Sequence, residues 1–149
     1  FVSKYGGEFD LIIYKSKVDG IEHIALVKGD IDKTKTVLVR MHHLNIFSDC
    51  LDDAQNARTG SLTKAMKKID KHGSGVIVII RQPSEPITHL LQTEANKPKH
   101  KEDELRSYGT GAQILSDLGI HNMTLLTNSK KAVIGLEGYG IRISGHKKL

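Results

Sequence analysis

The sequence has no tryptophan, one cysteine, three prolines and only 5% aromatic residues among its 149 positions. A single cysteine cannot form a disulfide within the chain, which favours a reducing compartment, and we expect a cytoplasmic location. No apolar run reaches the length of a membrane-spanning helix, so the sequence predicts no membrane span. Few aromatic side chains are available to stack on bases, which disfavours binding to single-stranded nucleic acid.

The chain carries a net charge of +5, which favours anionic partners. Its lysines are nevertheless spread along the sequence, and the densest basic runs contain no interleaved aromatic residues. A hydrophobic share of 38% and a charged share of 26% are typical of a soluble globular protein. The length suits one compact domain over residues 1–149, and the absence of an initial methionine suggests a piece of a longer protein.

The first 42 residues carry strand signals. Residues 8–16, 22–30 and 36–42 are rich in aliphatic side chains, and the Asp19-Gly20 pair between the first two segments is a turn signal. Short successive strands joined by tight turns predict an antiparallel sheet or a small barrel.

The rest of the chain alternates helical and strand patterns. A continuous apolar run at residues 75–81 is typical of a strand buried on both faces. The alternation predicts parallel pairing and an α/β (α+β) fold class, in which antiparallel strands precede an α/β half. Residues 82–103 hold all three prolines and much charge, and we expect an irregular, mobile connection there. Helices are expected at 61–73, 109–119 and 130–140, and further strands at 123–128 and 141–144.

A polar stretch at residues 39–60 contains His42, His43, Asp49 and Cys50, which are residue types that can ligate a metal. Adjacent histidines on a strand point to opposite faces, so these two converge only if the chain turns there. The single cysteine could act as a nucleophile, but a lone cysteine is more often a small buried hydrophobe. The residues alone leave three options: a metal site, a former metal site, or an ordinary polar loop.

Seven motifs follow one another along nearly the whole chain: HIALVKGDI, VLVRMH, GVIVIIRQ, TEAN, LRSYGTGAQILSDLGI, LLTNSKK and GLEGYGI. In this order and spacing they resemble the GTP cyclohydrolase II family. The resemblance implies opening of the imidazole ring of GTP, with release of formate and pyrophosphate. In many bacteria this domain is fused behind 3,4-dihydroxy-2-butanone 4-phosphate synthase in a bifunctional riboflavin-pathway protein. The resemblance therefore implies that synthase domain and GTP as partners, and a homodimer.

The family's chemistry uses a zinc that is held by three cysteines and activates a water at its open position. When the family pattern is laid on this chain without a gap, the three ligand positions fall on Asn45, Asn56 and Arg58. Carboxamides are weak zinc ligands compared with thiolates, and a guanidinium cation cannot ligate zinc. Cys50 falls between these positions. The resemblance thus predicts a former metal site and no cofactor, with magnesium only if GTP binds. A replacement site built from the polar stretch above is the alternative.

Other family positions are partly kept. Two residues of the family's catalytic motif correspond to Glu104, which replaces an aspartate, and Arg106. Substrate-contacting positions correspond to Arg40 and Thr127, and Lys131 lies beside the position of a family lysine. A shift of about 1 Å in a catalytic group can cost roughly a hundredfold in rate, so the longer acid matters. Each retained residue also has a structural interpretation, as a strand-end cation, a helix or pairing group, or a partner of backbone atoms. We treat all five as vestigial.

We therefore interpret the chain as a GTP cyclohydrolase II-like domain that has lost its zinc site and ring-opening activity and has a structural or regulatory role. The alternatives are an active enzyme with a rebuilt site, and a module that binds GTP without turnover. A structural zinc can contribute on the order of 10 kcal/mol to ordering its loop. Its loss predicts mobility over residues 43–59 unless side chains organise that segment.

Overall fold

The computed structural model describes residues 1–82, 86–88, 101–128, 136 and 139–149, with only the backbone of residues 101–105. The helices are α1 (Ile46–Cys50), α2 (Ser61–His72) and α4 (Lys101–Asp117). The strands are β1 (Val2–Ser3), β2 (Gly7–Glu8), β3 (Asp10–Lys15), β4 (Glu22–Lys28), β5 (Val37–His43), β6 (Gly75–Ile80), β7 (Asn122–Leu126) and β8 (Arg142–Lys147). Six of them form one sheet in the order β3-β4-β6-β5-β7-β8, and β1 pairs with β2.

The main sheet has an antiparallel and a parallel part. Strands β3 and β4 form a hairpin across the predicted turn, where Gly20 adopts a φ of 72°, and β4 then pairs antiparallel with β6. Strands β6, β5, β7 and β8 are mutually parallel. The predicted α/β class with antiparallel strands ahead of parallel ones is therefore confirmed. The barrel option is not realised among the described strands, because the hairpin continues the edge of the parallel part.

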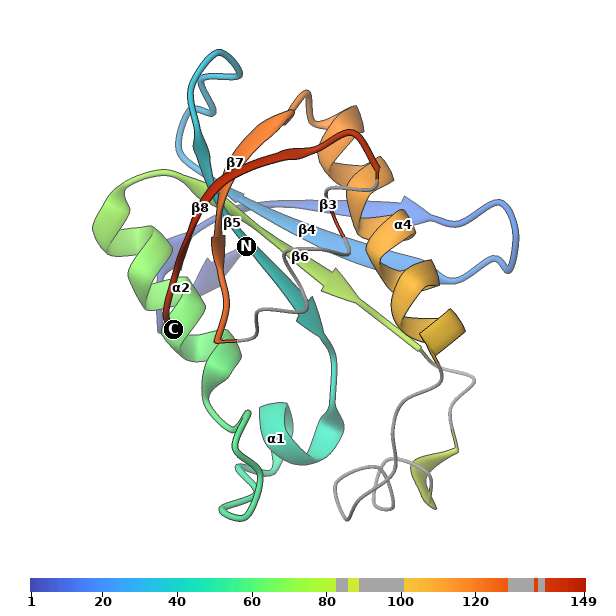
Figure 1. The fold of residues 1–149 in the computed structure, drawn as a ribbon. Coiled ribbons are helices and arrows are strands. Elements are labelled where there is room, and N and C mark those ends of the chain that lie inside the picture. The colour runs from blue at the N-terminus through green and yellow to red at the C-terminus, as the bar shows by residue number, and fades with distance from the viewer. Residues whose placement is uncertain (83–85, 89–100, 129–135, 137–138) are drawn as a thin grey trace.

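The two faces of the sheet are covered by different helices. Strand β6 is buried at all six positions, as its apolar run predicts, and its side chains alternate between two hydrophobic clusters. Val76 and Val78 pack with Leu115 of α4 on one face, and Ile77 packs with Ile69 of α2 on the other. Figure 1 shows α2 in green and α4 in orange on either side of the sheet.

Several sequence expectations change in detail. The third predicted strand, β5, lies inside the parallel part between β6 and β7, because five of its seven residues are buried. Helix α4 begins about two turns before the predicted helix and is followed by Gly119 in the left-handed conformation, with a φ of 75°. The expected helix at 130–140 and most of the segment at 82–103 lie outside the described residues, so the mobility predicted for that segment stays a prediction. No described helix is long and apolar enough to cross a membrane.

Candidate functional site

The carboxyl ends of the parallel strands β5, β6 and β7 meet at one edge of the sheet, which we call the carboxyl edge. Ligands of sheets with parallel strands commonly bind at such an edge. Arg40 is the middle residue of β5, Arg81 directly follows β6, and Thr127 directly follows β7. Thr127 is buried, and its N–H donates to the carbonyl oxygen of Lys147 at 2.9 Å. The sheet therefore brings two of the predicted substrate positions, Arg40 and Thr127, onto neighbouring strands.

Arg40 connects β5 to the end of β7. Its Nη1 atom donates to the carbonyl oxygen of Leu126 at 3.0 Å. Its pKa is lowered to about 10, chiefly by burial and also by the positive charge of Arg58, while Asp49 acts in the opposite direction. Its Nε atom is buried and has no hydrogen-bond partner among the described residues. Arg40 thus lies within its own strand, not at its end, and its guanidinium bonds the end of the neighbouring strand.

The two asparagines that the resemblance places at ligand positions have local backbone roles. Asn45 is the N-cap of α1, and its Oδ1 atom accepts hydrogen bonds from the N–H groups of Phe47 at 2.9 Å and Ser48 at 3.1 Å. Asn56 forms a turn in which its Oδ1 atom accepts from the N–H of Arg58 at 2.9 Å. In both residues, the oxygen that a metal would require already accepts backbone hydrogen bonds.

The residue at the third ligand position, Arg58, is exposed, and its positive charge contributes to the lowered pKa of Arg40. Within the described part of the chain, no three His, Cys, Asp or Glu side chains come together in a group that could hold a metal ion. Two committed carboxamides and a cation are a poor donor set for zinc, which prefers thiolate, imidazole or carboxylate. The residues at the three ligand positions therefore do not fit the family's metal.

A buried histidine–aspartate pair lies beside these positions. The Nε2 atom of His42 is 2.8 Å from Oδ2 of Asp49, and their side chains are only 4% and 2% exposed. The same Oδ2 atom accepts from the N–H of Asn45 at 2.8 Å. The chain does turn after β5, so one of the two histidines meets the aspartate, whereas His43 is half-buried on the strand. Cys50 is exposed at the last position of α1, so the expectation of a buried cysteine is wrong.

Side chains organise the segment that follows β5. Besides the cap at Asn45 and the turn at Asn56, the Oδ1 atom of Asp53 accepts from the N–H of Gln55, and Thr59 donates through Oγ1 to the carbonyl oxygen of Asp53. This is the condition under which we expected residues 43–59 to be ordered without a metal. Helix α1 was not predicted, although Asn45 followed by an acidic residue in the first turn is a recognised helix-start signal.

Of the predicted catalytic pair, Glu104 and Arg106, the structure describes only the side chain of Arg106. Arg106 lies on α4 with an exposed side chain, and its carbonyl oxygen accepts from Oγ1 of Thr110 within the helix. The side chain of Glu104 and the whole of Lys131 lie outside the described residues. The vestigial roles of these three residues therefore stay predictions.

His23 is a contact at the carboxyl edge that sequence reasoning missed. It is buried at the start of β4, and its Nδ1 atom accepts from the N–H of Arg81 at 3.3 Å. Burial lowers its pKa, with a further decrease from the charge of Arg81 and an opposing effect of Asp19. No motif marks this residue, because the contact depends on the antiparallel pairing of β4 with β6.

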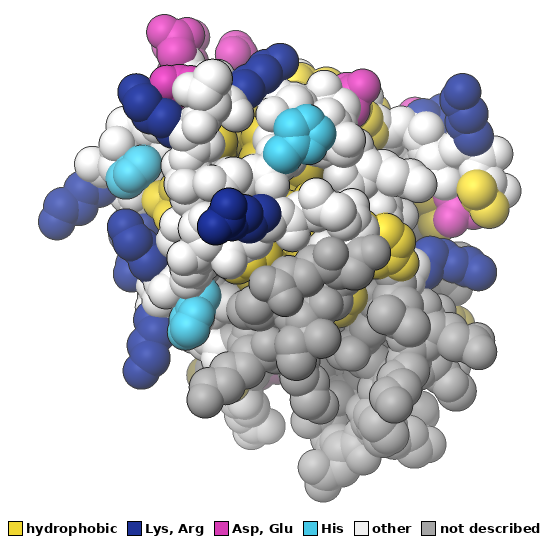
Figure 2. All heavy atoms as spheres, turned by 45° about the horizontal axis from the view of Figure 1, so that its top comes forward, with side chains coloured by type: hydrophobic (Ala, Val, Ile, Leu, Met, Phe, Trp, Pro, Cys, Tyr) yellow, Lys and Arg dark blue, Asp and Glu magenta, His cyan; other side chains and the backbone are white. Residues whose placement is uncertain are grey.

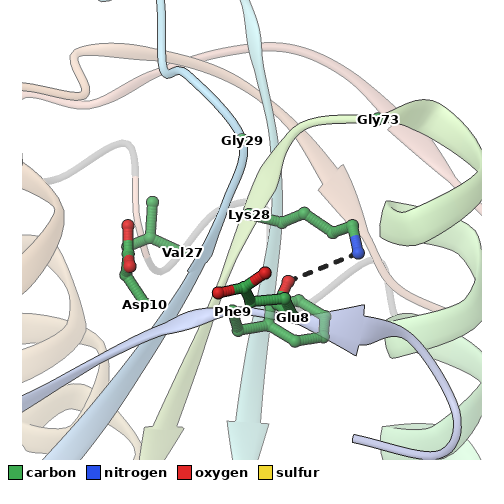
Figure 3. Close-up of a pocket in the computed structure, with 7 residues that line it drawn as sticks. All are labelled: Glu8, Phe9, Asp10, Val27, Lys28, Gly29 and Gly73. Carbon is green, nitrogen blue, oxygen red and sulfur yellow. Dashed lines mark hydrogen bonds between the residues drawn. The ribbon is translucent and has the colours of Figure 1, made fainter. Parts of the chain in front are cut away.

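A shallow pocket of about 310 Å³ lies at the opposite end of β6, away from the carboxyl edge. Figure 3 shows the residues that line the pocket, with the Lys28 side chain pointing toward the carbonyl oxygen of Glu8. The ammonium group of Lys28 forms an ion pair with Asp70 and donates to the carbonyl oxygens of Gly6 and Glu8. It also lies 5.0 Å from the centre of the Phe9 ring. Because this cation is already fully bonded, we interpret the pocket as a structural junction.

The surface offers no clear footprint for nucleic acid on the face seen in Figure 2. Lysine and arginine side chains there are separated by uncharged surface and do not merge into one stripe. A continuous basic stripe is the usual electrostatic mark of a nucleic-acid site. The low expectation for nucleic-acid binding drawn from the sequence stays a prediction.

Comparisons with known proteins point to one family. The profile of the GTP cyclohydrolase II family matches residues 1–148. A riboflavin biosynthesis protein RibBA from Chlorobium phaeovibrioides is 39% identical, over 92% of this chain and 37% of its own length. A monofunctional riboflavin biosynthesis protein, RIBA 2, chloroplastic, from Arabidopsis thaliana is 38% identical, over 93% of this chain and 30% of its own. The chain thus spans about a third of these relatives. The name of the plant protein describes it as chloroplastic, so the cytoplasmic location expected for this chain stays a prediction.

Proposed function

The chain belongs to the GTP cyclohydrolase II family, and we propose that it is a domain of a riboflavin-biosynthesis protein that has lost the zinc site and the ring-opening activity. In its place we propose a structural or regulatory role. The observation that carries this proposal is the state of the three ligand positions. Asn45 and Asn56 use their side-chain oxygens for the backbone of α1 and of a turn, and Arg58 is a cation.

The chemistry of the family gives this observation its weight. Opening the imidazole ring requires a strong nucleophile, which the family obtains from a zinc-bound water whose pKa falls toward about 7. Neither a carboxamide nor a guanidinium can replace thiolates in holding that metal. No step through zinc can be derived from the residues present, so loss of turnover is the expected consequence.

The partner of the domain follows from the same family. We propose that it associates with a 3,4-dihydroxy-2-butanone 4-phosphate synthase domain, fused or separate, and contributes to its assembly or stability. A relative from Oryza sativa is described as a probable bifunctional riboflavin biosynthesis protein, and the chain covers 29% of its length. The remaining length of such relatives leaves room for a second domain.

GTP turnover by the purified chain tests the proposal. The assay follows formate and pyrophosphate release with zinc and magnesium supplied, and elemental analysis measures retained metal. We expect no product above background and no stoichiometric zinc. Product formation together with one zinc per chain would mean that a rebuilt site exists, and the proposal would then be wrong.

Binding of GTP without turnover is the second candidate function. Arg40 supports it, because its guanidinium is held at the carboxyl edge beside Thr127 and only part of it is committed to the carbonyl oxygen of Leu126. Lys131 and Arg106 would belong to the same site. Calorimetric titration with GTP and magnesium distinguishes the two functions: heat that disappears in an Arg40→Met variant would favour binding, and the absence of heat would favour the structural role.

A further inference from the structure

The carboxylate of Asp49 joins strand β5 to the segment between β5 and α2, in addition to the backbone hydrogen bond from the N–H of Leu44 to the carbonyl oxygen of Ile80. Oδ2 of Asp49 accepts from the N–H of Asn45 at 2.8 Å and lies 2.8 Å from Nε2 of His42. His42 belongs to β5, Asn45 begins the segment, and Asp49 lies in α1, so one atom joins three successive parts of the chain. Hydrogen bonds to an ionised carboxylate are about twice as strong as those between neutral groups.

The other half of the fastening is the cap of α1. The side chain of Asn45 accepts from two backbone N–H groups of the first turn, while its own N–H is held by Asp49. The cap and the carboxylate therefore restrain each other, much as in a reciprocal capping pair. A helix of five residues is too short to be stable alone, so α1 depends on these contacts.

Burial indicates that this arrangement is a fixed part of the fold. The side chains of His42 and Asp49 are almost completely excluded from solvent, and Ser48 of α1 is buried with them. A buried carboxylate is tolerated only when its partners are in place, because removing one partner leaves an uncompensated charge. Exposed pairs contribute little by comparison.

We infer that the network of His42, Asn45 and Asp49 is a metal-independent fastening that holds residues 44–60 at the carboxyl edge. It does with protein atoms what a structural metal does in a metal-dependent loop, and this inference rests on the proposed loss of the zinc site. The domain can then keep the shape of the family's edge without keeping its chemistry. That shape is what a partner domain or a retained nucleotide would contact.

The test compares thermal unfolding and hydrogen exchange of the 149-residue chain with and without a zinc chelator. We expect chelation to leave the Tm unchanged. Asp49→Ala should lower the Tm by roughly 5–10 °C and speed exchange in residues 44–60 more than in β6. Asp49→Asn keeps one acceptor oxygen, so its Tm and its exchange rate in residues 44–60 should lie between those of Asp49→Ala and wild type. Gln55→Ala, at an exposed position of the same segment, is the matched control and should change neither quantity.

The outcomes separate this inference from the proposed function. A Tm that falls on chelation, with zinc recovered from the chain, would overturn the proposed loss of the metal. No effect of chelation, combined with equal exchange in Asp49→Ala and Gln55→Ala, would overturn the fastening alone. If Asp49→Ala fails to fold, hydrogen exchange of the wild-type chain tests the inference instead. Protection of the N–H groups of Asn45 and Phe47 supports the inference, and exchange as fast as in an exposed turn overturns it.

Discussion

Two networks of charged and polar groups lie at opposite ends of the central sheet, and they differ in how completely they are bonded. At one end, Lys28 has three N–H donors and three acceptors, in Asp70, Gly6 and Glu8, as Figure 3 shows in part. At the carboxyl edge, Arg40 Nε, His42 Nδ1 and Asp49 Oδ1 are buried without partners among the described residues. Native structures leave few buried polar atoms unpaired.

This difference indicates what each network is for. A fully bonded cation is explained by the fold alone, because it ties the hairpin of β1 and β2 to β4 and α2. Incompletely bonded polar groups are characteristic of sites that once served, or still serve, a ligand. The carboxyl edge holds several buried polar groups, while Asn45 and Asn56 bond the backbone and Arg58 is an exposed cation.

Of the two cations Lys28 and Arg40, Lys28 on the fully bonded side is expected to contribute more to stability. Lys28→Met keeps the aliphatic stem against Phe9 but removes all three hydrogen bonds, which leaves two carbonyl oxygens without their donor. We expect the free energy of unfolding to fall by about 2–3 kcal/mol, as measured by urea denaturation. Lys17→Met, at an exposed position, is the control and should change it by less than about 0.5 kcal/mol.

A smaller effect is expected for Arg40 at the carboxyl edge. Arg40→Met removes one hydrogen bond to Leu126, but it also removes a desolvated cation that lies under the influence of Arg58. These contributions oppose each other, so we expect a loss of about 1 kcal/mol or less by the same urea measurement. Arg142→Met, at an exposed position of β8, is the control. A loss as large as that of Lys28→Met would erase the distinction between the two networks.

The sequence was sufficient for the elements whose signal is local. The apolar run of β6, the helical spacing of α2 and the left-handed Gly73 at its end were predictable, because burial on both faces and a helix stop leave direct compositional marks. The pairing partner of each strand was not predictable from such local signals. Whether β4 pairs with β5 or with β6 depends on contacts far apart in the chain, and short-range patterns carry no information about them.

The candidate site was predictable only as a set of positions. The resemblance indicated that Asn45, Asn56 and Arg58 occupy ligand positions, and chemistry indicated that they suit zinc poorly. Periodicity could not reveal the five-residue helix α1, which is too short to show it, so the N-cap signal at Asn45 is its main local mark in the sequence. Nor could the resemblance indicate that Asp49 reaches His42, since that contact requires the turn after β5.

The smallest expected effect comes from pH at His23, where the two parts of the sheet meet. The N–H of Arg81 donates to Nδ1 of His23, which requires that this nitrogen be unprotonated. Burial lowers the pKa of His23 below its ordinary value of 6.5, so the unfolded chain binds the proton more readily than the folded one. The resulting stability is fully present above about pH 6.5 and is lost as the pH falls through the folded pKa.

His23→Asn tests this contact, because its side-chain oxygen can accept from Arg81 at the place of Nδ1 but does not titrate. We expect urea denaturation between pH 7 and pH 5 to show a shallower loss of stability in this variant than in wild type. His121→Asn, at an exposed position, should retain the wild-type slope. Equal slopes in all three proteins would show that the acid sensitivity arises elsewhere.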